Sequence, residues 1–348
     1  EAWDSALNTV NVGKFQFGFC SIGISTHAFY EALDHASGRT LYGMKVTDFP
    51  HVRRTFVEAY ARLVAMKLYG LRATDYLRSA SENDRRYLMF NPIMKMKVTS
   101  QGEKVVGLLH EIIAAKGFEQ DTYFETAIRD IGALPKLEGT THVNMALVIK
   151  FTKNYFFGKG SLPEIPRRDD VADDTYLFRQ KAGGLQDVQF GDYRKAFEGW
   201  SQIRNLSLFQ TQIEALRKML MQAPPTKEQA GNVDFMLASG ELLTLVAYSQ
   251  LVLESAKLER RSPQSVASSS NTAVDDAVLE QIFAFVVRDF AGYALAIRQL
   301  YDVTPDQGRI LDEMISVRPV QDSTSLAGVW DRHVSSLRGV YPTGLGQS

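Results

Sequence analysis

The sequence predicts an all-α protein, with a four-helix up-and-down bundle followed by a second helical bundle. Apolar residues recur every three or four positions through several long stretches, which is the period of one buried helix face. Alternating period-2 segments that end in turn dipeptides are nearly absent. Two capping boxes, Thr226–Gln229 and Thr304–Gln307, mark helix starts, and the second has proline at its first helical position.

The helices are expected in a definite order along the chain. The first contains His27 and His35 and ends at the glycine-flanked break GRTLYG, residues 38–43. The second carries an apolar stripe over residues 56–71. Residues 94–98 alternate like a short strand, but they lie inside a longer helical pattern, so a helix is expected there too. Three further stripes lie in the C-terminal half, at 206–220, 242–253 and 279–300.

The chain divides into two helical regions around a connector. Residues 158–191 hold two prolines, five glycines and the charged run Arg167–Asp170, a composition typical of a linking segment. A second polar stretch, Ser262–Thr272, contains three consecutive serines and is expected to be a loop between helices. We therefore predict four segments: a helical bundle at 1–157, a connector at 158–187, a second helical bundle at 188–338 and a tail at 339–348.

The composition is that of a globular chain with enough apolar residues for a sizeable core. Of 348 residues, 45% are hydrophobic and 23% are charged. The formal net charge of −1 provides no global positive field, so we expect no nucleic-acid partner. Because no charge-free apolar stretch of about 18 residues is present, we expect no membrane span.

Cysteine and histidine usage narrows the chemistry. The single cysteine, Cys20, excludes a disulfide framework within the chain and is typical of a reducing compartment, so we expect a cytoplasmic protein. It lies in the apolar run FGFCSIGI, where we expect a buried core thiol rather than a nucleophile. Six histidines are scattered without a metal-ligand spacing such as HExxH, and we expect no metal site. The segment FFGKGS, residues 156–161, lacks the upstream glycine and the preceding strand of a phosphate loop.

Two segments of the first region have both a structural and a chemical interpretation. Arg39 lies in the glycine-flanked break, where its guanidinium fits either a bound phosphate or the carbonyl end of the preceding helix. Glu138 lies in LPKLEGTTHVN, residues 134–144, just ahead of a long apolar run. It fits a helix-start acid, with Thr140 or Thr141 as the N-cap, and it also fits a catalytic base placed at a bend.

Three motifs occur in a fixed order. Arg39-Thr-Leu-Tyr42-Gly43 follows the first long helix, Gly117-Phe118 and Arg129-Asp130 come next, and Glu138-Gly139-Thr140 comes eight residues after that last pair. In this order and register they resemble the Arg-x-x-Phe-Gly turn, the Gly-Phe turn with its Arg-Asp pair, and the Glu-Gly-Thr of one family. Residues 8–157 thus resemble the C-terminal helical domain of the FAD-dependent acyl-CoA dehydrogenases. The remainder of the chain resembles the extra helical domain of the long-chain members.

The resemblance implies a reaction and its base. In most members the glutamate of Glu-Gly-Thr removes the α-proton of an acyl-CoA thioester, while the β-hydrogen leaves as hydride to FAD and gives a trans-2-enoyl-CoA. This assigns the base to Glu138, a carboxylate that becomes a stronger base when it is desolvated between the flavin and the acyl chain. Some members carry the base on the first long helix instead, and the matching position here is Gly13, which has no side chain.

The resemblance also assigns binding residues. The segment that reaches the FAD pyrophosphate of a neighbouring subunit is matched by Arg39, Thr40 and Leu41, and a second such segment by Glu111, Ala114 and Ala115. Contacts to the flavin after the glutamate are matched by Thr140 and His142, and positions near the substrate by Asn11, Lys14 and Gly139.

Several of these positions depart from the family pattern. Lys14 keeps the charge of a usual arginine but loses its planar fork, and Asn11 replaces an acid. Glu111 replaces a usual glutamine, and the pair Ala114–Ala115 replaces two glycines. An acid and two methyl groups oppose the close approach of a pyrophosphate, so the base is assigned more firmly than the cofactor contacts.

The family builds its active site with two further domains, an N-terminal helical one and a middle β-domain that holds the flavin ring. This chain starts near the beginning of the third domain, so we expect the C-terminal part of a longer enzyme, with little or no dehydrogenase activity of its own. The implied partners are an acyl-CoA substrate, the N-terminal part of the enzyme, further copies in a dimer or tetramer, and electron-transfer flavoprotein or a similar acceptor. Two alternatives stay open: a non-catalytic scaffold or partner subunit of the same fold, and an acyl-CoA oxidase.

Overall fold

Helices make up nearly all of the regular structure. The computed structural model describes residues 2–158, 160–171, 173, 175–180, 184–261 and 274–341. The N-terminal helices are α1 (Ala2–Gly38), α2 (Pro50–Arg78), α3 (Tyr87–Ile93), the π-helix η2 (Met94–Val98), α4 (Thr99–Ile113), α5 (Tyr123–Ala133), α6 (Thr141–Val148) and α7 (Thr152–Phe157). The later helices are α8 (Thr175–Arg179), α9 (Arg194–Phe197), α10 (Arg204–Gln222), α11 (Lys227–Gly231), α12 (Val233–Arg261), α14 (Asp276–Leu300), α15 (Pro305–Ser316), α16 (Ser323–Val329) and the π-helix η6 (Trp330–Val334). Short 3₁₀ turns join them: η1 (Val46–Asp48), η3 (Ala114–Phe118), η4 (Ile149–Phe151), η5 (Leu185–Asp187) and η7 (Ser335–Leu337).

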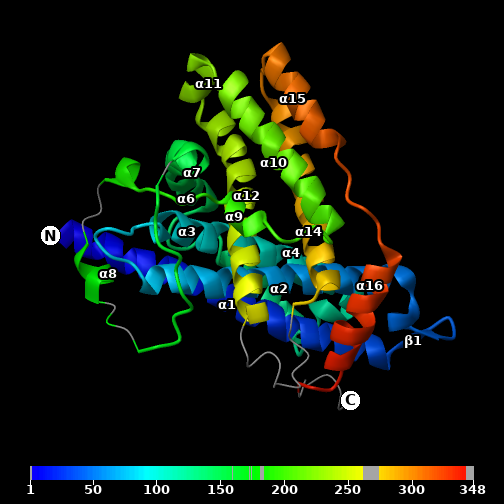
Figure 1. The fold of residues 1–348 in the computed structure, drawn as a ribbon. Helices are drawn as coiled ribbons and strands as arrows, with labels where there is room; N and C mark the ends of the chain where they lie inside the picture. The colour runs from blue at the N-terminus through cyan, green and yellow to red at the C-terminus, as the bar shows by residue number, and fades with distance from the viewer. Residues whose placement is uncertain are drawn as a thin grey trace.

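The long helices form two groups that cross steeply. In Figure 1, α1, α2 and α4 run along one another, and α10, α12 and α14 stand across them. Helix α1 packs chiefly on α4, while α12 and α14 pack on each other and both pack on α2. A single set of buried apolar side chains continues from the first group into the second. The all-α class is therefore confirmed, whereas the segment boundaries stay a prediction.

The contact between α1 and α4 depends on a glycine. A Cβ atom added at Gly102 of α4 would lie 2.0 Å from the Ser21 hydroxyl oxygen of α1, far inside van der Waals contact. Only glycine lets the two helix backbones approach this closely. This close approach fixes α1 against α4, the helix that leads into the Gly117-Phe118 turn.

A short hairpin replaces the simple break that was expected after α1. Strands β1 (Thr40–Leu41) and β2 (Met44–Lys45) pair antiparallel. Tyr42 and Gly43 both have positive φ, 51° and 78°, as a two-residue hairpin turn of the primed type requires. The glycines of GRTLYG predicted that the helix ends here. The pairing of the two strands depends on the positive φ angles of Tyr42 and Gly43.

Helix α2 carries two buried arginines that face the second group. The first, Arg62, donates to Gln101 at 2.6 Å, to Glu58 at 2.9 Å and to Asp289 of α14 at 2.9 Å. Its guanidinium also lies over the Phe285 ring, 4.2 Å from the centroid. Burial by itself would raise the pKa of Asp289, but hydrogen bonds and charge from Arg62 hold that pKa well below its usual range.

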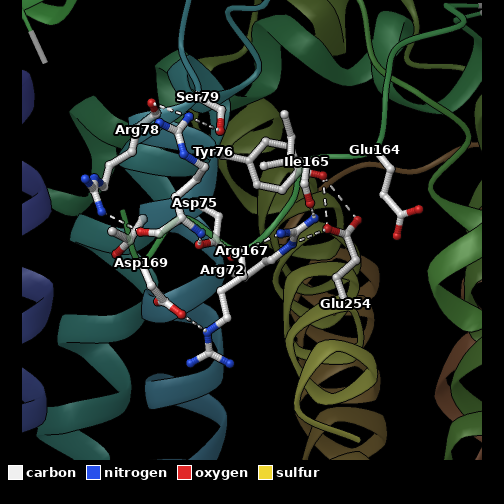
Figure 2. A network of polar contacts seen from close by, with 12 residues as sticks. Arg72, Asp75, Tyr76, Arg78, Ser79, Glu164, Ile165, Arg167, Asp169 and Glu254 are labelled. Atoms are coloured by element: carbon white, nitrogen blue, oxygen red, sulfur yellow. Dashed lines mark hydrogen bonds and ion pairs between the residues drawn. The ribbon is translucent and has the colours of Figure 1, made fainter. Parts of the chain in front are cut away.

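The second buried arginine, Arg72, ties α2 to α12 and to the connector. It donates to Glu254 of α12 at 2.8 Å, to Asp75 at 3.0 Å and to the Ile165 carbonyl at 2.8 Å. Figure 2 shows these groups converging with the Tyr76 hydroxyl, which donates to Glu254 at 3.0 Å. The two arginines thus join every major part of the fold through one helix.

The helix caps and the segment 94–98 can now be compared with the sequence expectations. Both capping boxes are present, with the side-chain and backbone hydrogen bonds of each in place. Residues 94–98 form a π-helix rather than a strand. Cys20 is exposed on α1, so the expectation of a core thiol was wrong: Gly18 and Ile22 of the same apolar run are buried, whereas Phe19 and Cys20 face outward. The loop Ser262–Thr272 and most of the tail, 342–348, lie outside the described residues.

Helix α12 is long and apolar enough to cross a membrane by length and composition alone. In this structure 72% of its most apolar window is buried by other helices. That burial is what a core helix of a globular domain shows, and it accounts for the apolar composition.

We expect Asp289→Asn to lower the free energy of unfolding by about 3 kcal/mol at neutral pH, because it leaves the buried Arg62 with the less buried Glu58 as its one remaining carboxylate among the described residues. The folded pKa of Asp289 is depressed, so its stabilising effect is present above the unfolded pKa of about 3.9 and is lost as pH falls below it. Urea unfolding should therefore show a shallower loss of stability below about pH 4 in the variant than in the parent chain.

The control for this experiment is Glu313→Gln. Glu313 accepts from Lys218 at 2.7 Å, but both side chains are nearly half exposed, so the change should be below about 1 kcal/mol. Equal effects of the two substitutions would contradict a special role for the buried pair.

Candidate active site

The bend between α5 and α6 places Glu138 in an unusual backbone conformation. Glu138 has φ 51° and the following Gly139 has φ 91°. Two consecutive left-handed residues reverse the chain sharply, and only glycine adopts this conformation without a penalty. Glu138 carries about 1–2 kcal/mol of strain, and such strain in a non-glycine residue commonly marks a functional position. The Glu138 side chain is exposed.

The start of α6 locks this bend. Thr140 is the N-cap, and its hydroxyl accepts from the backbone N–H of Val143 at 3.4 Å. The buried Asn144 amide donates to the carbonyls of Gly139 at 3.1 Å and Thr140 at 3.0 Å. The predicted cap is therefore confirmed at Thr140. Glu138 lies two residues before it and is left to project from the bend.

The carboxylate of Glu138 faces α1. A Cβ atom built at Gly13 would lie 3.8 Å from the Glu138 carboxyl carbon and 3.9 Å from its Oε2. Gly13, which the resemblance matches to the alternative base position on the first helix, thus lies directly beside Glu138, which it matches to the usual base. Because Gly13 has no side chain, it leaves room for this carboxylate.

Two lysines carry positive charge close to Glu138. Lys14, next to Gly13 on α1, is buried; desolvation lowers its pKa, and the charge of Glu138 opposes this lowering. Lys95 on the π-helix is fully buried, and burial together with the charges of Lys14 and Lys136 lowers its pKa to about 8, against the charge of Glu138. Within the described residues the Lys95 ammonium has no hydrogen-bond partner.

Lys95 was missed by sequence reasoning. The signal was present as two lysines in the apolar run MKMKV, residues 94–98, but an α-helix would point residues two apart in different directions. The whole segment is enclosed by α1, α3, α4 and α6, so both lysines are buried on different sides of it. Lys97 donates to the Tyr293 hydroxyl at 2.9 Å in the second group of helices, whereas the charge of Lys95 acts toward Glu138.

Asn11 is half-buried on α1, three residues before Lys14 and so on the same side of the helix. The structure thus brings the expected substrate residues Asn11, Lys14 and Gly139 to one end of the bundle with Glu138. Thr140 and His142 lie at the same end and are exposed. His142 also lines a shallow hollow of about 260 Å³ against α12, together with Glu241 and Tyr301.

The expected pyrophosphate residues lie at the opposite end of α1. About 25 residues of helix at about 1.5 Å each separate Gly13 from Gly38, a distance of about 38 Å. Figure 1 shows the hairpin at the far end of α1 from the N-terminus. Arg39, Thr40 and Leu41 are all exposed there, and no described residue pairs with the Arg39 guanidinium.

The second pyrophosphate segment lies near the first. Burial, Arg39 and Lys116 all lower the pKa of His35, which shows that the end of α1 and the turn η3 share one environment. Glu111, Ala114 and Ala115 at the end of α4 are exposed. The solvent-facing Arg39 guanidinium is suited to bind an anionic pyrophosphate. The negative charge of the Glu111 carboxylate would repel that pyrophosphate.

The remaining candidate residues have structural roles. Arg129 and Asp130 form an exposed pair at 3.7 Å, and Arg129 also contacts Glu125 at 3.1 Å. His27 stacks on Tyr123 with ring centroids 3.9 Å apart. Among the described residues, no group of three or more histidine, cysteine or acidic side chains is placed to hold a metal ion.

Comparison with known proteins identifies the class of this bundle. Residues 2–152 match the family model described as acyl-CoA dehydrogenase, C-terminal domain. This part of the chain therefore belongs to the acyl-CoA dehydrogenase family and forms its C-terminal helical domain.

The very long-chain specific acyl-CoA dehydrogenase, mitochondrial, of Rattus norvegicus is homologous to it, at 26% identity over 140 residues, which cover 40% of this chain and 21% of the relative.

The fold as a whole is also known. The acyl-CoA dehydrogenase from Bacillus anthracis, solved in complex with FAD, matches 96% of this chain and 56% of its own length, with a TM-score of 0.65 and 14% identity. Acyl-CoA oxidase 1 from Yarrowia lipolytica matches 95% of this chain and 50% of its own, with a TM-score of 0.53 and 14% identity. At these identities the matches establish the fold, including the helices after residue 157. The chain spans about half the length of these solved structures.

We expect Lys95→Met to raise the free energy of unfolding at neutral pH by about 2 kcal/mol, because it removes a buried ammonium without a partner at similar volume. The folded pKa, about 8, lies below the ordinary 10.5. Between these values the unfolded chain binds more protons, so this lysine makes stability rise with pH there, and the variant should lack that rise. Urea unfolding at about pH 7 and pH 10 measures both effects.

The exposed Lys45→Met is the matched control. An identical pH dependence of the unfolding free energy in the two variants would show that Lys95 does not cause the rise in stability with pH.

A second expectation concerns the turn at the end of α4. Ala114 has φ 57° and ψ −142°, a conformation that suits glycine. Ala114→Gly should therefore raise the free energy of unfolding by about 1 kcal/mol, although glycine normally destabilises. Ala115→Gly, at ordinary φ, should lower it by about 0.5–1 kcal/mol. Thermal unfolding of the two variants compares them directly, and a loss of stability in both would exclude strain at Ala114.

Proposed function

We propose that this chain is the base-carrying helical part of an FAD-dependent acyl-CoA dehydrogenase that acts on long-chain acyl-CoA and gives trans-2-enoyl-CoA. The observation that carries the proposal is the placement of Glu138. Its carboxylate projects from a strained, capped bend and faces Gly13, at the one place in the family fold where the alternative base would stand. The homology to a very long-chain dehydrogenase supports the long acyl chain.

Glu138 takes the α-proton of the thioester and holds it on its carboxylate. The rigid backbone around it, held by Thr140 and Asn144, fixes the direction of the carboxylate before substrate arrives. The buried lysines Lys14 and Lys95 place positive charge close to this carboxylate and attract it toward α1 and the π-helix. FAD, when bound, accepts the β-hydrogen as hydride.

The two ends of α1 serve different copies of the cofactor. The distance between them is greater than one dinucleotide extends, so Arg39 cannot bind the pyrophosphate of a flavin that lies against Glu138 of the same chain. Arg39, Thr40 and Leu41, with Ala114 and Ala115, would instead contact the FAD of a neighbouring subunit. The proposal therefore requires a dimer or tetramer, together with the flavin-holding part of the enzyme and electron-transfer flavoprotein or a similar acceptor.

The test uses the longer protein that carries this chain, loaded with FAD. Glu138→Gln keeps the shape of the side chain but cannot accept the proton, so it should slow exchange of the substrate α-proton with deuterated water by about 100-fold or more. Mass spectrometry of a long-chain acyl-CoA measures this exchange. Glu125→Gln, which alters a surface acid on the neighbouring α5, should leave the exchange unchanged.

Unchanged exchange in Glu138→Gln would refute the base assignment and favour the scaffold alternative, which the altered residues Glu111 and Ala115 support. An acyl-CoA oxidase is the second candidate, because an oxidase shares the fold over nearly the whole chain. The two enzymes differ in the reoxidation of reduced flavin. Rapid reoxidation by oxygen alone identifies the oxidase, and dependence on an added acceptor identifies the dehydrogenase.

A further inference from the structure

A second pocket, remote from Glu138, lies between α7, α10 and α12. Its volume is about 450 Å³, within the range of small-molecule sites in proteins. Phe156, Phe157, Leu216, Met219 and Leu243 line most of it. Phe157 is 38% exposed, so the pocket has an apolar wall that reaches solvent.

The charge at this pocket has one sign. Lys150 and Lys153 are three residues apart in the chain and both line the pocket, and both are exposed. In the described part of the chain neither ammonium has an ion-pair partner, and no carboxylate is among the residues that line the pocket. An apolar hollow with two free cations at its edge is complementary to a molecule that has an apolar body and an anionic end.

The polar groups in the wall do not make this an aqueous site. The Gln307 side chain is occupied, because its amide nitrogen donates to Gln229 and to the carbonyls of Ala223 and Pro224. The Ser239 hydroxyl is buried, and within the described residues it has no hydrogen-bond partner. This hydroxyl is a single neutral group in a wall that is otherwise mostly apolar, so the charge at the pocket comes from the two lysines.

Helix α6, which follows Glu138 in the chain, separates the pocket from this glutamate. Helix α6 has eight residues, about 12 Å in length, and leads from the Glu138 bend to Ile149 in the pocket wall. Its contact with α12 is close, since a Cβ at Gly240 would lie 2.5 Å from Ile149 Cγ2 and 2.6 Å from the Met145 sulfur. The pocket is thus a different site from the one that holds the reacting thioester.

We propose that this pocket binds a free long-chain fatty acid, with the hydrocarbon chain against Phe156, Leu216 and Leu243 and the carboxylate beside Lys150 and Lys153. The proposal does not rest on the dehydrogenase activity, because binding at this place needs neither FAD nor Glu138. Occupancy would act on α6, whose first turn caps the Glu138 bend and whose last turn leads into the pocket wall.

The experiment titrates hexadecanoate, below its micellar concentration, into the 348-residue chain and measures heat. One bound molecule per chain is expected. The double variant Lys150→Gln/Lys153→Gln should weaken binding by about fivefold or more, while binding of the uncharged analogue 1-hexadecanol should stay the same. Lys45→Gln/Lys116→Gln removes the same charge elsewhere and should have no effect.

A second variant tests the hydrocarbon part. Ser239→Leu fills part of the pocket and should abolish binding of both ligands, whereas Ser207→Leu on the exposed side of α10 should not. Far-ultraviolet circular dichroism checks that each variant is folded, and the surface lysine variants keep the test valid if Ser239→Leu is not. Absence of hexadecanoate binding, or equal binding by the parent and the Lys150→Gln/Lys153→Gln variant, would overturn the proposal.

Discussion

The two buried arginines of α2 are the constraint on which the rest of the structure depends. A guanidinium taken out of water must be paired and fully hydrogen-bonded, since an unmatched buried charge costs several kcal/mol. Arg62 has Glu58 and Gln101 beside it but is completed by Asp289 of α14, and Arg72 has Asp75 but is completed by Glu254 of α12 and the Ile165 carbonyl of the connector. The position of the later helices on the first bundle is therefore specified by charge as well as by apolar contact.

The length of α1 organises the functional residues. One end lies beside Glu138 and the other carries the exposed Arg39 hairpin, about 38 Å away by helix rise. Residues that belong to one family site are consequently divided between two ends of the molecule. Under the proposed function, this arrangement is the reason to expect an oligomer, because Glu138 and Arg39 of one chain would contact different copies of the cofactor.

Part of the positive charge near the Glu138 bend comes from the π-helix at residues 94–98. The π-helix of residues 94–98 is enclosed by helices on several sides, so both Lys95 and Lys97 are buried. Lys97 contacts Tyr293 and Glu241 of the second group, at 2.9 and 3.7 Å, while the Lys95 ammonium near Glu138 has no hydrogen-bond partner among the residues that the structure describes. One wide helical turn thus connects the interface between the two groups of helices with the charge at the candidate site.

The sequence by itself determined the all-α class, the helix starts at Thr226 and Thr304, a cap at Thr140 or Thr141, and the family that residues 8–157 resemble. These depend on local spacing and hydrogen bonds between near neighbours, which a sequence states directly. Only the tertiary structure decided that Gly13 faces Glu138, that Lys95 is buried beside it, and that Cys20 is exposed. Each of these depends on which face a helix turns toward a distant segment. A cap is decided by near neighbours in the sequence, whereas the packing of one helix on another is decided by contacts between residues far apart in the chain.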